Sequence, residues 1–174
     1  MSPSFRPLVL RCLTAAALLS LCACGDRESV GPEPGQPSFY RSLAAPGARV
    51  DAQAARDMIS LYRSNNGLSA LDVDATLQQA AQAQADAMAA ANSLAHDVRG
   101  TLDERLTARG MRSARAAENV SAGYHTLAEA FSGWRQSPPH NRNLLMKGAT
   151  RMGIGAAFAP GTKYKVYWAL ILAD

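Results

Sequence analysis

The segment from Tyr164 to Leu172 constrains the fold most, because it is apolar on both of its alternating faces. One face carries Tyr164, Val166, Trp168, Leu170 and Leu172, and the other carries Lys165, Tyr167, Ala169 and Ile171. A strand with two apolar faces must be covered on both sides, so layers of structure must lie above and below it. Residues 152–158 also alternate, and Pro160-Gly161-Thr162 predicts a turn between the two segments. The chain therefore ends in a predicted β-hairpin.

The chain ahead of this hairpin shows helical periodicity. Asp51 is a favourable N-cap for a first helix, and Asn65-Asn66-Gly67 should end it because Asn and Gly accept the left-handed conformation. An alanine-rich second helix is predicted over 74–92. Residues expected to face inward are Ala54, Ala55, Met58, Leu61 and Tyr62 in the first helix and Leu77, Ala81, Ala85 and Met88 in the second. Gln78, Gln82 and Asp86 are expected to face solvent.

Two further helices are indicated by capping boxes. Thr101 with Glu104 predicts a short third helix, and Thr126 with Glu129 predicts a fourth helix that ends near 138–139. Helices come first, and the buried strands of the sheet come last. This order predicts an α+β fold, a three-layer α-β-α sandwich with a central, mainly antiparallel sheet.

The first 24 residues carry the features of an export signal. Arg6 and Arg11 precede an apolar stretch, 12–23, which suits a signal-peptide core and is too short to span a bilayer. The stretch ends in Leu21-Cys22-Ala23-Cys24, which resembles the lipobox of bacterial lipoproteins. We therefore predict that residues 1–23 are a lipoprotein signal peptide and that Cys24 is lipidated. Cys22 is the poorer lipidation site, and the alternatives are an ordinary secretory signal or a retained membrane helix.

Residues 24–49 are predicted to be an extended tether, because they are rich in Pro and Gly and lack a helical period. The domain is then predicted to occupy 50–174. All three cysteines, Cys12, Cys22 and Cys24, precede it. The domain therefore has no disulfide, no cysteine-based metal site and no catalytic thiol.

The charge of the chain argues against a nucleic-acid partner. The formal net charge is +4, from 18 Lys and Arg against 14 Asp and Glu, and there is no run of basic residues. Hydrophobic residues make up 48% of the chain, which is enough for one well-packed domain. We expect that domain to be monomeric.

Six short segments, taken in order, point to one family. They are Tyr62-Arg63-Ser64-Asn65-Asn66-Gly67-Leu68, Leu94-Ala95-His96, Ala117-Glu118-Asn119-Val120, residues 134–145 (WRQSPPHNRNLL), Met152-Gly153-Ile154-Gly155 and Tyr167-Trp168-Ala169-Leu170. Together they resemble the CAP superfamily (cysteine-rich secretory proteins, antigen 5 and pathogenesis-related 1), also called the SCP-like extracellular domain. The resemblance covers about 50–174 and is closest to the cysteine-free bacterial branch. It implies an α-β-α sandwich with a shallow central cleft.

The resemblance also implies a set of cleft residues. The family's cleft holds two histidines and two glutamates, which bind a divalent metal in some members. The first histidine corresponds to His96, the glutamate of the Glu-Asn motif to Glu118, and the second histidine to His140. The position of the second glutamate is Ser137 here, which should weaken a metal site.

Chemistry leaves two interpretations of these residues, which sit in segments that resemble loops or ends of elements. Two imidazoles and one carboxylate form a His₂Glu ligand set, so a Zn²⁺ ion held by His96, Glu118 and His140 is one hypothesis. In the other, Glu118 and Asn119 satisfy backbone groups of a buried turn, and His140 caps the turn that follows.

Three functions remain open from the sequence. The favoured one is a lipid-anchored binding module in the cell envelope, with lipid, peptidoglycan or envelope proteins as partners. The alternatives are a metal-assisted hydrolase that uses the cleft residues and a structural envelope protein with no small ligand. The predicted location is exported and anchored to a bacterial membrane, with the domain in the periplasm or at the cell surface. Gly25 follows Cys24, which favours the outer membrane where a cell has two.

Overall fold

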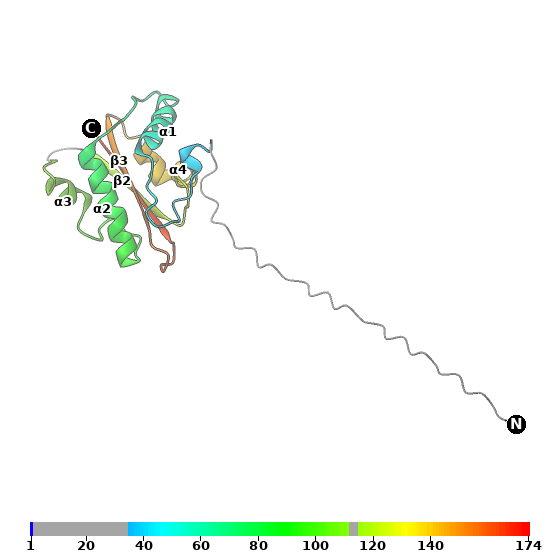
Figure 1. Ribbon diagram of the computed structural model, residues 1–174. Helices are drawn as coiled ribbons and strands as arrows, with labels where there is room; N and C mark the ends of the chain where they lie inside the picture. Colours follow the sequence, from blue (N-terminus) through cyan, green and yellow to red (C-terminus); the bar gives the residue numbers. More distant parts are fainter. Residues whose placement is uncertain (2–34, 112–114) are drawn as a thin grey trace. The chain divides into compact units, whose positions relative to one another are not determined.

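Four strands form the centre of the fold in the computed structural model, which describes residues 1, 35–111 and 115–174 (Figure 1). The sheet order is β1-β3-β4-β2, with β1 parallel to β3 and both other pairs antiparallel. The strands are β1 Asp72–Val73, β2 Ala116–Ala122, β3 Arg151–Phe158 and β4 Val166–Ala173. The helices are η1 Ser38–Tyr40, α1 Ala52–Ser64, α2 Ala75–Ala91, α3 Leu102–Thr107, α4 Leu127–Gln136 and α5 Pro138–Leu144.

Every residue of β4 is buried, as the two-faced apolar pattern predicts. Trp168, Leu170 and Leu172 join the core beneath α1, α4 and α5. Tyr167, Ala169 and Ile171 join a second core beneath α2 and α3. Figure 1 shows α2 and α3 on one side of the sheet and α1 and α4 on the other. The predicted α-β-α sandwich and its mainly antiparallel sheet are confirmed.

Helix α2 lies unusually close to β3. A Cβ atom on Gly153 would lie 2.1 Å from the backbone carbon of Leu77, and one on Gly155 would lie 2.4 Å from Cα of Gln82. Only glycine leaves room for this approach, which explains both glycines in the strand.

The same approach corrects one prediction for α2. Gln78 exchanges hydrogen bonds with the backbone of Ile154, and Gln82 donates to the carbonyl of Ala156 at 3.0 Å. These glutamines therefore bind the backbone of β3 instead of facing solvent. Asp86 is exposed, as predicted.

The predicted helix caps are confirmed, whereas the inward face of α1 is partly wrong. Asp51 caps α1, and the capping boxes open α3 and α4. In α1, Leu61 is 64% exposed, while Ile59 and Arg63 are fully buried. Arg63 takes an inward position because its guanidinium donates to four backbone carbonyls.

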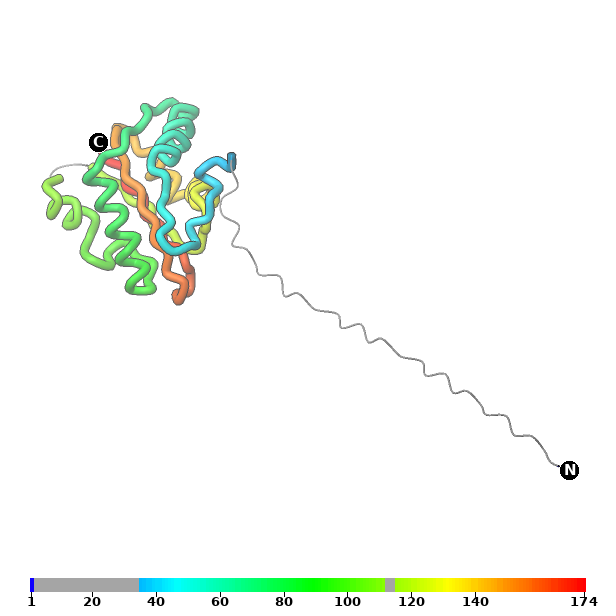
Figure 2. The backbone as a smooth tube through the Cα atoms, viewed as in Figure 1, coloured from blue at the N-terminus to red at the C-terminus, as the bar shows by residue number. Residues whose placement is uncertain are grey.

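The described part of the predicted tether packs against the domain. Leu43 is 7% exposed and belongs to the core beneath α1 and α4. Its amide donates to the carbonyl of His125 at 2.7 Å, and Figure 2 shows this segment running beside the start of α4. The predicted boundary at residue 49 is therefore wrong, because the domain includes apolar residues from Phe39 onward. The Pro and Gly residues of this segment interrupt any helical or strand periodicity, so the sequence pattern does not reveal that it packs against the domain.

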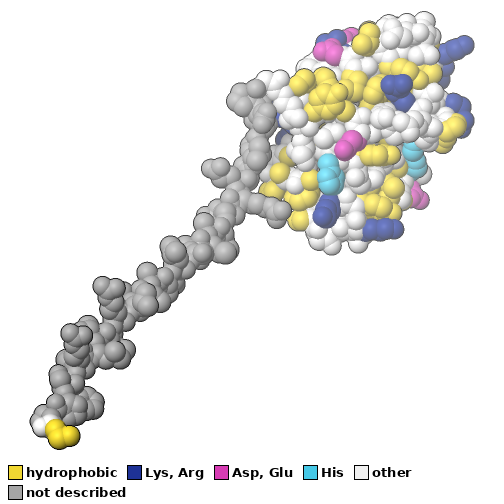
Figure 3. Space-filling model, turned by 90° about the vertical axis from the view of Figure 1, so that its right-hand side faces the viewer, with side chains coloured by type: hydrophobic (Ala, Val, Ile, Leu, Met, Phe, Trp, Pro, Cys, Tyr) yellow, Lys and Arg dark blue, Asp and Glu magenta, His cyan; other side chains and the backbone are white. Residues whose placement is uncertain are grey.

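The predicted signal peptide and Cys24 lie outside the described residues. In the described part of the chain, no helix is long and apolar enough to cross a membrane. On the face drawn in Figure 3, lysines and arginines are dispersed among hydrophobic and uncharged side chains.

Candidate functional site

The edge strand β2 carries the centre of the candidate site. It pairs with β4 on one side only, and Glu118 and Asn119 follow one another along it. Consecutive side chains of a strand point to opposite faces of the sheet. Glu118 is 6% exposed and Asn119 is 1% exposed, so both need polar partners. The prediction that Glu118 lies in a loop or at the end of an element is wrong, because it lies within a buried strand.

Arg105 of α3 neutralises the buried Glu118. Its Nη2 lies 2.8 Å from Oε1 of Glu118, and the exposed fractions of the two side chains are 8% and 2%. The sequence analysis missed Arg105. The sequence does point to Arg105, because it shares one face of a short helix with Leu102 and Leu106. A charge on an apolar face requires a buried partner.

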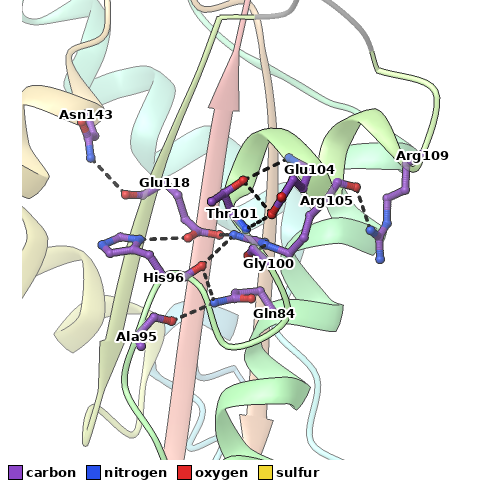
Figure 4. Close-up of polar contacts among 10 residues, drawn as sticks. All are labelled: Gln84, Ala95, His96, Gly100, Thr101, Glu104, Arg105, Arg109, Glu118 and Asn143. Carbon is purple, nitrogen blue, oxygen red and sulfur yellow. Dashed lines mark hydrogen bonds and ion pairs between the residues drawn. The ribbon is translucent and has the colours of Figure 1, made fainter.

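His96 binds the other carboxylate oxygen of Glu118. Its Nδ1 lies 2.9 Å from Oε2 of Glu118, while the His96 side chain remains 59% exposed (Figure 4). The ring is thus held at one nitrogen by a buried carboxylate and presents its other side to solvent.

The backbone of His96 is held as firmly as its ring. Gln84 of α2 is 1% exposed, and its Nε2 donates to the carbonyls of Ala95 at 2.9 Å and His96 at 3.2 Å. Arg105 also donates to the carbonyl of His96 at 3.2 Å. The sequence analysis missed Gln84 as well, although its place on the inward face of α2 marks it as a polar residue that needs partners.

Asn119 ties the second histidine to the opposite face of β2. Its Nδ2 donates to the carbonyl of His140 in α5 at 3.0 Å. Asn143, one turn later, donates to the carbonyl of Glu118 at 3.0 Å and to Oδ1 of Asn119 at 2.9 Å. Two consecutive residues of one strand therefore bind the ring of His96 and the main chain of His140, which are 44 positions apart in the sequence.

The pKa of His140 depends on its burial and on the other histidine. Partial burial lowers the pKa of His140 below its ordinary value of 6.5, and the charge of His96 lowers it further. A charge on His96 is thus felt at His140.

Ser137 lies between α4 and α5, where it is the C-cap of one helix and the N-cap of the next. It is partly buried, and its hydroxyl makes no capping hydrogen bond. Within the described residues, no hydrogen bond links it to His96, Glu118 or His140. Its expected place on the rim of the cleft remains a prediction.

The residues present do not fit the hypothetical Zn²⁺ site. Both carboxylate oxygens of Glu118 are already bound, one by Arg105 and one by His96. A guanidinium cation beside the carboxylate also repels a second cation. Across residues 35–111 and 115–174, no three His, Cys, Asp or Glu side chains are grouped so that they could hold a metal ion. The His₂Glu ligand set of the zinc hypothesis is not assembled among these residues.

An α-β-α sandwich that holds a His-Glu pair and a second histidine at one edge strand defines a CAP-type domain. The family model for the cysteine-rich secretory protein family, CAP, matches residues 56–172. The chain therefore belongs to this family.

Bacterial proteins are among its relatives. The uncharacterized protein YkwD of Bacillus subtilis is 24% identical over 137 residues, which are 76% of this chain and 53% of that protein. The chain thus spans about half the length of this relative.

Solved structures show the same fold. An extracellular protein containing an SCP domain from Bacillus anthracis is 26% identical, with a TM-score of 0.62, over 71% of this chain and 40% of that one. An outer surface protein from Borrelia burgdorferi is 19% identical, with a TM-score of 0.63, over 74% of this chain and 98% of that one.

Proposed function

We propose that this protein is a lipid-anchored, extracytoplasmic CAP-domain protein that binds a component of the cell envelope at the site formed by His96, Glu118 and His140. The observation that carries the proposal is that consecutive residues of β2 bind both histidines, Glu118 at the ring of His96 and Asn119 at the backbone carbonyl of His140. The buried polar side chains around His96 position an imidazole that stays exposed to solvent. A residue that only stabilised the fold would not need an accessible ring, so this arrangement favours a role in binding a ligand.

The predicted export signal supports a role in the envelope. The lipobox-like Leu21-Cys22-Ala23-Cys24 favours an anchor at Cys24, and Gly25 favours the outer membrane of a cell that has two. The Bacillus anthracis relative is described as extracellular and the Borrelia burgdorferi one as an outer surface protein. The domain would then face the periplasm or the cell surface, where peptidoglycan, lipids and envelope proteins are available.

The binding experiment measures how much of the purified full chain in detergent co-sediments with peptidoglycan sacculi, and separately how much floats with phospholipid vesicles. The double variant His96→Ala, His140→Ala should no longer sediment with sacculi, and its flotation should fall to the level that the lipid anchor alone supports, because the anchor inserts into vesicles without the histidines. His125→Ala is the matched control, because His125 is an exposed histidine at the start of α4. If the two histidines affect binding to neither target, the binding proposal is wrong. The alternative of a structural envelope protein with no small ligand is then favoured.

The anchor is tested by metabolic labelling with a fatty acid. The unsubstituted chain should incorporate label and partition into the detergent phase, whereas Cys24→Ser should do neither and should retain its signal. Cys22→Ser is the control and should be labelled normally. Labelling of Cys24→Ser would refute the anchor without affecting the binding proposal.

A further inference from the structure

Three buried polar side chains hold one exposed imidazole. Gln84, Arg105 and Glu118 are 1%, 7% and 6% exposed and come from α2, α3 and β2. Between them they bind the carbonyl of His96 and its Nδ1 (Figure 4). Arg105 also donates from Nε to the carbonyl of Gly100 at 3.2 Å, which fixes the loop after His96.

The charges in this chain of contacts decide which nitrogen of His96 carries the proton. The guanidinium of Arg105 stays protonated in proteins and lies 2.8 Å from Oε1 of Glu118, so the carboxylate is ionised. An ionised carboxylate can only accept hydrogen bonds. The contact of 2.9 Å between Oε2 and Nδ1 of His96 therefore requires the proton on Nδ1.

The opposite nitrogen then has a defined role. In the neutral form of His96, Nε2 has no proton and presents a lone pair. Figure 4 shows this side of the ring pointing away from Glu118, and the side chain is 59% exposed.

We propose that Arg105 and Gln84 are positioning residues that hold His96 with Nε2 as a hydrogen-bond acceptor, so that the site receives a ligand group that donates, such as a hydroxyl or an N–H. The proposal rests on the proposed binding function and adds that His96 accepts, and the ligand donates, the hydrogen bond between them. Arg105 acts through Glu118 by keeping it ionised, and Gln84 acts through the main chain of 95–96.

A purely structural role for Arg105 makes a different prediction. If Arg105 only stabilises the fold, its replacement lowers stability but leaves the protonated nitrogen of His96 unchanged in the molecules that remain folded. The tautomer of His96 therefore separates the two roles, because thermal stability alone would fall in both.

The experiment records ¹⁵N spectra of the imidazole nitrogens in the full chain, in detergent micelles, at about pH 8.5, well above the ordinary histidine pKa. The unsubstituted chain should show His96 protonated at Nδ1. Glu118→Gln keeps the shape of the side chain, and its amide can still accept from Arg105 while donating to Nδ1. In that variant the proton of His96 should therefore move to Nε2.

Two substitutions of Arg105 test its part in the effect. Arg105→Lys keeps the positive charge and should keep the Nδ1–H tautomer. Arg105→Met removes it, and His96 should become a mixture of tautomers. The spectrum of His125 is the internal control and should not change in any variant. Protonation of His96 at Nε2 in the unsubstituted chain, or no change in Glu118→Gln, would overturn the proposal.

A binding arm separates this inference from the proposed function. Where sacculi or vesicles bind, Glu118→Gln should raise the half-saturating concentration at least about tenfold, because the ligand's donor then meets another donor. Unchanged binding together with a switched tautomer would refute the contact at Nε2. Failure of the unsubstituted chain to bind either target would refute the proposed function, and the tautomer result would still decide whether His96 is held as proposed.

Discussion

Arg63 should be one of the most costly residues to replace in this fold. Its side chain is fully buried, and it donates to the carbonyls of Leu144 at 2.9 Å and Ala149 at 3.0 Å, both in buried contacts. Two partly buried contacts reach the carbonyls of Ser69 and Met146, each at 3.0 Å. One guanidinium thus joins α1 to the end of α5 and to the two loops that border β1 and β3.

The cost of Arg63→Met follows from these contacts. Methionine keeps most of the apolar stem but removes the Arg63 donor from the buried carbonyls of Leu144 and Ala149, at about 1–3 kcal/mol each, and from two partly buried carbonyls at less. The cost at Ala149 is at the low end, because the Ser69 hydroxyl still donates to that carbonyl at 3.4 Å. Removing the cation relieves its burial cost, which lowers the pKa of Arg63, and this offsets part of the loss. We expect the free energy of unfolding to fall by about 4 kcal/mol, a large share of the ~5–15 kcal/mol of a typical domain.

Urea unfolding monitored by tryptophan fluorescence measures this loss. Arg56→Met is the matched control on the same helix, since Arg56 is 35% exposed and its partners, Asp57 and Gln53, lie on that helix too. The control should change the free energy of unfolding by no more than about 0.5 kcal/mol. A loss below about 1 kcal/mol for Arg63→Met would show that water or rearranged loops satisfy the carbonyls, and the reasoning would be refuted.

Three further predictions concern the sheet and the site. Gly155→Ala should lower the free energy of unfolding by about 1–3 kcal/mol or more, measured in urea, because its Cβ would lie 2.4 Å from Cα of Gln82. Trp168→Ala should cost roughly 3–5 kcal/mol in the same assay as a fully buried deletion, and a loss under ~1 kcal/mol would contradict the central place of β4. His140 should titrate below pH 6.5 in NMR spectra, and His96→Gln should raise its pKa by removing a nearby charge. Because its pKa is lower in the folded chain, the unfolded chain binds more protons, so His140 should cost stability as the pH falls through 6.5 toward the folded-state pKa.

The features that could be predicted from the sequence are those set by neighbouring residues or by periodicity. Asp51 caps a helix because the next residues supply the amides, and the strand that contains Trp168 reveals its two faces through alternation alone. Leu61 was misassigned because the helix is rotated so that Arg63 faces inward, and no periodicity rule expects an arginine there.

The polar network around Glu118 could not be predicted from sequence patterns, because its members are distant in the chain. Glu118 lies 13 residues from Arg105 and 22 from His96, and no local motif has such spacings. Only the family resemblance singled out His96, Glu118 and His140, and it says nothing of Arg105. A buried charge can be predicted to need a partner, but which partner it finds depends on how α3 packs against β2.

The absence of a second glutamate and the presence of Arg105 have one electrostatic consequence. Glu118 and Arg105 cancel within the site, and Ser137 adds no charge, so the site carries no net negative charge to attract a divalent cation. With the carboxylate bound to Arg105 and to the ring of His96, the role that we propose for His96 is that of a hydrogen-bond acceptor at Nε2. The arginine on the apolar face of a six-residue helix thus favours hydrogen-bonded recognition over metal chemistry at this edge of the sheet.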